Sequence, residues 1–156
     1  MGETVALTLP EGDNAYVALQ LNTHHAIQVR DWTGIRIPMY VQSTGRVFLA
    51  ARTDAVLARY LATPLLPYTA QTLVNPAQVH AEIERVRAQG YAWVFEEFEE
   101  GLTAVAAPVR DGAGQVVAAI SAFGPAFRFP AAGQQEATTQ LVVATARQLS
   151  TRLALR

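Results

Sequence analysis

The sequence predicts an α+β protein in which helices pack on a curved antiparallel sheet of six strands. The main observation is residues 90–125, where three segments of alternating apolar and polar residues are separated by turn residues. This alternation with period two is typical of a β-meander. A second set of alternating segments lies near the N-terminus, and helical patterns follow each set. The predicted order is three strands, helices, three strands and a final helix.

The first three strands are expected at residues 4–9, 16–21 and 25–32. The first two flank Pro10-Glu11-Gly12-Asp13-Asn14, which has the composition of a hairpin turn. In the third, small or apolar residues such as Ala26 are interleaved with polar ones, and Thr33-Gly34 closes it.

Short helices are expected after these strands. The hydroxyls of Ser43 and Thr44 can cap the free N–H groups of a helix over residues 45–51. A second helix begins at Asp54, and Pro64 and Pro67 break the chain after it.

Two longer helices have clearer signals. Asn75-Pro76 is a typical helix start, and Gly90 suits the left-handed position that ends a helix. The last helix is expected over residues 134–156, with an apolar stripe formed by Leu141, Ala144 or Thr145, Leu149 and Leu153.

Composition predicts one domain over residues 1–156. The chain is 51% hydrophobic and 16% charged, as in compact globular proteins. Its net charge of −1 argues against a free-standing nucleic-acid binder, which usually has a basic surplus. No cysteine is present, so disulfides and thiolate chemistry are excluded. No apolar run approaches the roughly 20 residues of a membrane span, and we expect a soluble cytoplasmic protein.

Small side chains share one face of two expected strands. Leu102, Ala104 and Ala106 lie on one face of the fifth strand, and Ala119, Ser121 and Phe123 on one face of the sixth. Such small residues either let a helix approach closely or leave space for a ligand.

Five segments together resemble the effector-binding domain of the IclR family of bacterial transcription regulators. They are the three segments of the meander, Gly34-Ile-Arg-Ile-Pro-Met, and Thr44-Gly-Arg-Val-Phe-Leu-Ala. The resemblance runs from about Val5 to about Leu153. It implies a GAF- or profilin-like fold with a ligand between sheet and helices. It also implies a homodimer or homotetramer, and a winged helix-turn-helix domain that this chain lacks.

The resemblance also implies a ligand site. Carried over position by position, it comprises Ala26, Val29, Ile37, Ser43, Thr44, Gly45, Arg46, Val94, Leu102, Ala104, Ser121 and Phe123. At Ser43-Thr44-Gly45-Arg46, backbone N–H groups, hydroxyls and a guanidinium converge, a combination that binds carboxylates.

The chain departs from the family pattern where Val94 stands for an acid and Phe123 for a hydroxyl residue, and Tyr40 replaces a frequent histidine. A less polar pocket suits an aromatic or medium-chain carboxylic acid. Alternatively, Phe123 fills the cavity and the domain serves only in assembly.

We expect no metal, cofactor or catalytic set. His24-His25 lacks a third ligand at a recognisable spacing, and Gly112-Ala113-Gly114 is a hairpin turn. Neighbouring glutamates such as Glu96 and Glu97 point to opposite faces of a strand, and all but Glu96, which could border the pocket, are expected on the surface or in a turn. The alternative functions are a small hydrolase or isomerase using Ser121, Glu96 or a histidine, and a structural dimerisation module.

Overall fold

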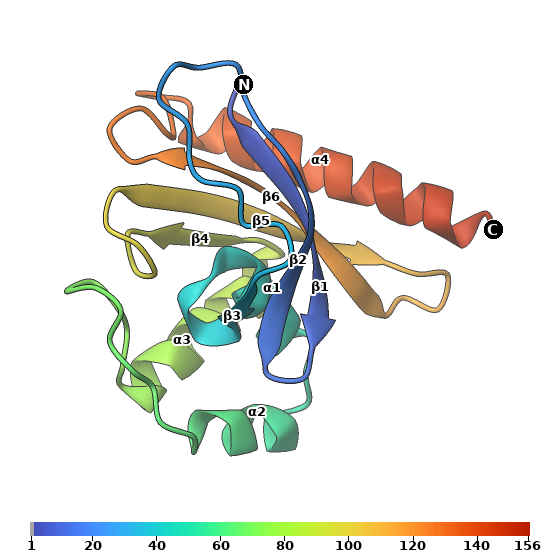
Figure 1. Cartoon of the computed structure of the whole chain (residues 1–156). Coiled ribbons are helices and arrows are strands. Elements are labelled where there is room, and N and C mark those ends of the chain that lie inside the picture. The colour runs from blue at the N-terminus through green and yellow to red at the C-terminus, as the bar shows by residue number, and fades with distance from the viewer. Residues whose placement is uncertain (1) are drawn as a thin grey trace.

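The structure, a computed structural model, describes residues 2–156 and confirms the predicted α+β architecture (Figure 1). One antiparallel sheet contains six strands in the order β3-β2-β1-β6-β5-β4. The strands are β1 (Thr4–Glu11), β2 (Asn14–Leu21), β3 (Arg36–Pro38), β4 (Ala92–Phe95), β5 (Leu102–Arg110) and β6 (Val116–Pro125). The helices are η1 (Met39–Val41), α1 (Ser43–Ala50), α2 (Asp54–Leu61), α3 (Pro76–Gln89) and α4 (Gln135–Ala154).

The sheet consists of two three-stranded halves that join through β1 and β6. Ala6 of β1 lies opposite Ser121 of β6, and Thr8 lies opposite Ala119. The first and last strands of the chain therefore form the centre of the sheet, and their small side chains meet there.

The prediction of a strand at residues 25–32 is wrong. Residues 22–35 contain no strand, and β3 is a short segment that begins at Arg36. The side chain of Gln20 provides the reason, because its Oε1 accepts a hydrogen bond from the Trp32 N–H and its Nε2 donates to the Arg30 carbonyl. The backbone at Arg30 and Trp32 is thus bonded to a side chain, and only Gly34 and Ile35 at the end of the segment bond to β2.

Helices cover both faces of the sheet. Helices α1, α2 and α3 share one hydrophobic core with the face that carries Ala6, Ala106 and Ala119. Helix α4 covers β5 and β6 on the opposite face, where Val142 and Ala146 pack (Figure 1). Since side chains alternate along a strand, β1, β4, β5 and β6 contribute to both cores.

The predicted ends of α2 and α3 are confirmed by their hydrogen bonds. The Thr53 side chain accepts from the Val56 N–H, and the Asn75 side chain accepts from the Ala77 N–H. Gly90 ends α3 with a φ of 83°, which a residue with a Cβ rarely adopts.

The prediction that Ser43 and Thr44 cap the first helix is wrong. Helix α1 begins at Ser43, with Gln42 at the N-cap position and no capping side-chain hydrogen bond. Both hydroxyl residues lie inside the first turn, and both are buried. They are available for another role because they do not close the helix end.

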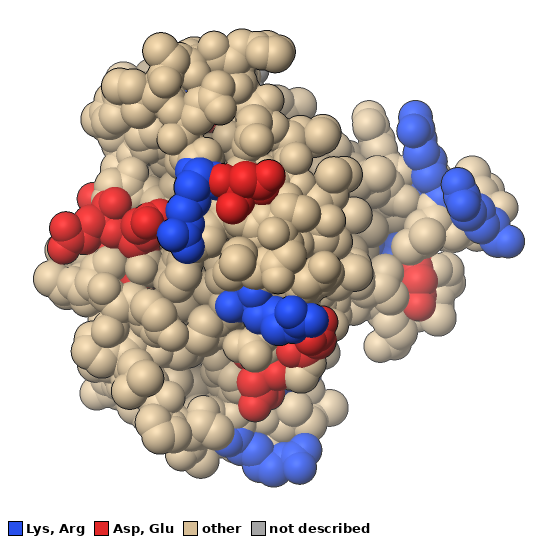
Figure 2. Space-filling view, viewed as in Figure 1, with Lys and Arg blue, Asp and Glu red and all other residues tan. Residues whose placement is uncertain are grey.

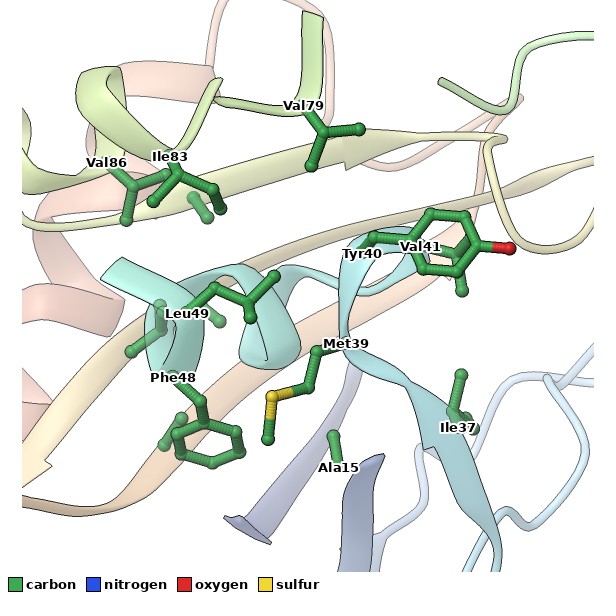
Figure 3. Close-up of a cluster of buried hydrophobic side chains, with 14 of the residues drawn as sticks. Ala15, Ile37, Met39, Tyr40, Val41, Phe48, Leu49, Val79, Ile83 and Val86 are labelled. Atoms are coloured by element: carbon green, nitrogen blue, oxygen red, sulfur yellow. The ribbon is translucent and has the colours of Figure 1, made fainter. Parts of the chain in front are cut away.

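Gly45 is required by a close approach of two backbone segments. A Cβ at this position would lie 2.3 Å from the Cα and the carbonyl oxygen of Met39. This contact lets η1 cross directly beside α1, so that Met39, Phe48 and Leu49 pack in one cluster (Figure 3).

Tyr60 of α2 supports the same turn. Its hydroxyl accepts a hydrogen bond from the Tyr40 N–H at 3.0 Å. Burial raises the pKa of Tyr60 to about 12, so the phenol stays neutral at physiological pH.

The predicted apolar stripe of α4 is confirmed at Leu149, which packs on the core beneath the helix, and wrong at Leu141 and Leu153, which are 49% and 40% exposed. The buried residues of the helix are Thr138, Thr139, Val142 and Ala146. The face on the sheet therefore carries mainly smaller residues than the predicted leucines.

Among residues 2–156, no helix is long and apolar enough to cross a membrane.

We predict that Gly45→Ala destabilises the fold by about 2 kcal/mol or more, because overpacking of a well-packed site typically costs about 1–3 kcal/mol and here the clash is with backbone. Gly112→Ala is the matched control, since its added Cβ would make only an ordinary contact, 3.7 Å from the Ala154 Cα. Urea unfolding of both variants measures the difference. Equal stability of the two variants would contradict the proposed contact.

Candidate functional site

A cavity lies between the sheet and the first turn of α1. Its volume, counted as the space open to the centre of a water molecule, is about 40 Å³. One water needs roughly 10–15 Å³ on this measure, so about three waters or a ligand group of similar size fit without rearrangement.

The floor of the cavity comes from the centre of the sheet, and each of the six strands contributes to it. Ala6 and Ser121 face each other across the β1–β6 pair, and Ala104 of β5 lies opposite Phe123 of β6. The sheet residues that line the cavity are Ala6, Thr8, Val17, Ile37, Val94, Leu102, Ala104, Ser121 and Phe123.

The facing wall is the connection from η1 into α1, which contributes Val41, Gln42 and Ser43. Ser43 occupies the first turn of α1, where backbone N–H groups have no partner within the helix. Of this first turn, only Ser43 lines the cavity.

Two aromatic side chains from loops complete the lining. Trp32 comes from residues 22–35 and Phe98 from the β4–β5 loop, and their ring centroids are 5.4 Å apart. Phe98 also contacts Tyr68, at 5.3 Å between centroids. We call Trp32 and Phe98 the roof of the cavity.

Four buried polar atoms at the cavity have no hydrogen-bond partner within the described residues. They are the hydroxyls of Thr8 and Ser43, the Trp32 Nε1 and the Gln42 Oε1. Buried polar atoms without a partner cost about 1–3 kcal/mol each and are rare in native proteins. Their concentration at one cavity indicates a site for a polar ligand.

The described lining residues include no charged side chain. Arg46, expected to contact a ligand, is 2% exposed and makes a two-pronged ion pair with Glu97, with N–O distances of 2.7 and 3.0 Å. Its Nε donates to the Tyr40 carbonyl. The guanidinium is thus fully engaged, and it borders a separate surface depression. The sequence predicts Glu97 on the surface or in a turn; it lies in the loop after β4, but its side chain is buried and not on the surface.

The Arg46–Glu97 ion pair helps to hold the β4–β5 loop, which carries Phe98. The Thr72 hydroxyl donates to the Glu97 carbonyl at 2.6 Å, and the Thr69 hydroxyl donates to the Glu96 carbonyl at 2.7 Å. Glu96 itself does not line the cavity, because its carboxylate accepts from the Gly101 N–H and closes the loop.

Seven of the twelve sequence-predicted site residues line the cavity: Ile37, Ser43, Val94, Leu102, Ala104, Ser121 and Phe123. Five do not. Ala26 is exposed and Val29 is half-buried in residues 22–35. Thr44 and Gly45 follow Ser43 around the helix, where each residue turns the chain by about 100°, and neither lines the cavity. Arg46 is paired with Glu97. Ligand binding by the seven remains a prediction.

Sequence reasoning missed seven lining residues: Ala6, Thr8, Val17, Trp32, Val41, Gln42 and Phe98. The alternation of β1 places Ala6 and Thr8 on the same face, and this signal could have identified them. Trp32 and Phe98 lie in loops, where no periodicity predicts the direction of a side chain.

The structure supplies no partner for Ser121 as a nucleophile. None of the described lining residues is a histidine, aspartate or glutamate, so no general base faces the Ser121 hydroxyl. No group of three potential metal-ligating side chains occurs among the described residues.

Known proteins resemble this chain along most of its length. Residues 1–151 match the family model described as the C-terminal part of the bacterial transcriptional regulator IclR. The chain is 34% identical over 150 residues to the HTH-type transcriptional regulator BhcR of Paracoccus denitrificans, covering 96% of this chain and 53% of that one. It is 40% identical over 115 residues to the Pca regulon regulatory protein of Pseudomonas putida, covering 73% and 40%. The chain thus spans about half the length of these relatives.

Solved structures show the same fold. A protein described as a transcriptional regulator from a Rhodococcus species superposes with a TM-score of 0.92 at 28% identity, over 98% of this chain and 63% of that one. The IclR of Thermotoga maritima superposes with a TM-score of 0.89 at 30% identity, over 97% and 62%. An IclR homologue from Microbacterium hydrocarbonoxydans, solved with 4-hydroxybenzoate, superposes with a TM-score of 0.86 at 24% identity, over 97% and 60%.

We predict that Glu97→Ala destabilises the fold by about 3–5 kcal/mol, because it leaves the Arg46 charge buried without a partner. Replacing both residues, Arg46→Met with Glu97→Leu, should restore most of that loss. The exposed Arg36–Glu11 pair is the control, and Glu11→Ala should cost about 0–1 kcal/mol. Denaturant unfolding of the three variants tests this, and a Glu97→Ala loss as small as the control's would refute it.

Proposed function

The chain belongs to the IclR family of bacterial transcriptional regulators, in which it corresponds to the C-terminal domain, and from this premise we propose that it senses a small organic acid. The whole chain, residues 1–156, acts as one effector-sensing domain. In the complete regulator, the occupied or free state of the domain controls DNA binding by a winged helix-turn-helix domain that precedes it. Such a regulator acts in the cytoplasm, where its DNA is.

The observation that carries this proposal is the set of four unpartnered polar atoms at one neutral cavity. A carboxylate can accept hydrogen bonds from the Ser43 hydroxyl, from the Ser43 backbone N–H at the start of α1 and from the Trp32 Nε1. Helix N-termini favour anions through such backbone N–H groups. Recognition therefore uses neutral donors, since Arg46 is engaged by Glu97.

The apolar part of the effector lies against Val94, Leu102 and Phe123. This lining favours an acid with an apolar body, as the departures from the family pattern predict. A compact acid fits the space of about 40 Å³ directly. An aromatic or medium-chain acid requires the roof residue Phe98 to move, since the sheet side of the cavity is rigidly hydrogen-bonded. The hydroxybenzoate-bound homologue has the same fold, which makes such acids useful probes.

The alternative functions have less support. The cavity lining has no base for hydrolase or isomerase chemistry among the described residues, and the relatives are regulators. A purely structural role would leave the four polar atoms unexplained, and a cavity remains beside Phe123.

We predict that the domain binds at least one acid from a panel of acetate, pyruvate, benzoate and 4-hydroxybenzoate, measured by calorimetry. Ser43→Ala should weaken that binding about 10- to 100-fold, because a hydrogen bond to a charged group contributes about 1.5–3 kcal/mol. Ser121→Ala should weaken it less, and Phe123→Ser should shift preference towards smaller, more polar acids. Ser150→Ala, on α4, is the matched control and should bind like the parent. An unchanged affinity in all three cavity variants would place the site elsewhere.

We also predict that the isolated domain forms homo-oligomers, and that the regulator binds DNA only through the domain that precedes it. Light scattering should give a dimer or tetramer mass at high micromolar concentration. A gel shift at physiological salt should show no tight complex with DNA, since charges of both signs are interspersed on the face in Figure 2. A strictly monomeric mass, or submicromolar specific DNA binding, would contradict the respective part.

A further inference from the structure

We infer that Trp32 senses the occupant of the cavity and that residues 22–35 carry this state to the N-terminal end of the domain. The inference rests on the proposed function, because it assigns a route by which effector binding reaches the rest of the regulator. It is carried by contacts that connect Trp32, Gln20, Thr23 and Gly2.

Trp32 is the part of the roof that can recognise a ligand chemically. Trp32 is 5% exposed and lines the cavity, and its buried Nε1–H has no partner among the described residues. An indole N–H can only donate, so a ligand that offers a carboxylate or carbonyl oxygen satisfies it and a purely apolar ligand does not. The occupant therefore determines where the Trp32 ring rests.

The position of Trp32 is coupled to its segment through Gln20 at the end of β2. The Gln20 Oε1 accepts from the Trp32 N–H at 3.0 Å. The Nε2 of the same amide donates to the Arg30 carbonyl at 3.1 Å and to the Asn22 Oδ1 at 2.7 Å. One buried side chain thus joins the start of the segment to Arg30 and Trp32, and a shift of Trp32 acts on Asn22 through a single amide.

The segment touches the start of the chain directly after Asn22. The Thr23 hydroxyl donates to the Gly2 carbonyl at 2.7 Å and accepts from the His25 N–H at 3.4 Å. Figure 1 shows this stretch running beside the N-terminus, at one end of the sheet. In the proposed regulator, the DNA-binding domain joins at this end, so the Thr23–Gly2 contact is well placed to report cavity occupancy.

The segment is suited to move because little holds it. Residues 22–35 contain no helix or strand, and six of the seven residues 22–28 are exposed. Its far end is fixed to β2, where Val17 exchanges backbone hydrogen bonds with Gly34 and Ile35. Motion is therefore expected between Asn22 and Trp32 while the sheet stays in place.

Tryptophan fluorescence and hydrogen exchange test the inference. The chain has two tryptophans, and Trp93→Phe leaves Trp32 as the only one, whose emission is excited selectively over that of the five tyrosines. Trp93 lies outside the cavity lining, and phenylalanine keeps a ring beside Phe95 and Phe129. The acid that binds most tightly in the panel above is titrated into this variant while Trp32 emission and backbone amide exchange are followed.

The expected result is a saturable shift of Trp32 emission together with at least a two-fold change in exchange for residues 2–4 and 22–32. Gln20→Ala should keep the emission shift but abolish the change at residues 2–4, because it removes the amide that joins the segment. Gln89→Ala is the control, since its amide donates to the Tyr91 carbonyl far from this route. If the acid binds and exchange at residues 2–4 stays constant, or if Gln20→Ala leaves that change intact, the coupling is wrong while the effector site stands.

If no acid of the panel binds, the proposed acid recognition fails and the coupling is decided without a ligand. Ala104→Leu fills the cavity from the sheet and imitates an occupant, and Ser121→Val serves if that variant does not fold. A changed exchange at residues 2–4 and 22–32 relative to the parent supports the coupling, and an unchanged exchange overturns it.

Discussion

The pairing of β1 with β6 is the interaction on which the rest of the structure depends. It joins two antiparallel halves, each built from neighbouring segments, into one sheet, and it links residues that are more than a hundred positions apart. The same pairing sets Ala6 and Thr8 beside Ser121, which creates the floor of the cavity. Without it the hydrophobic core under α1, α2 and α3 would be incomplete, because that core is formed by both halves of the sheet.

The second determinant is how closely α1 approaches this sheet. Gly45 lets the helix lie against the backbone at Met39, and residues 43–49 are all buried as a result. A charge carried into that position must be neutralised, and Glu97 meets Arg46 from the β4–β5 loop. Because the Arg46 guanidinium is paired with Glu97, its charge is not available to a ligand in the cavity. The same pair helps to position the loop that bears Phe98. Neutral donors are what remain at the cavity.

Sheet and roof have different physical characters. The floor is held by continuous strand pairing, whereas Trp32 and Phe98 are held by a few side-chain contacts from two loops. In the proposed sensor, a fixed floor and a less restrained roof would let the cavity admit acids of different size, and binding would be transmitted through the two loops.

The sequence by itself determined those elements whose signals are local. Asn75-Pro76 and Gly90 set the limits of α3, and alternation around short turns set β4, β5 and β6. The same alternation identified four lining residues, Leu102, Ala104, Ser121 and Phe123, whereas Ile37, Ser43 and Val94 came from the resemblance to the family. Tertiary structure decided the rest. Within residues 25–32 the backbone bonds to the Gln20 amide instead of forming a strand. On α4, Val142 and Ala146 are buried while Leu141 and Leu153 are exposed. Arg46 pairs with the carboxylate of Glu97, 51 positions away in the sequence. Periodicity and capping act over a few residues, whereas burial, ion pairing and cavity shape depend on partners that only the folded chain brings together.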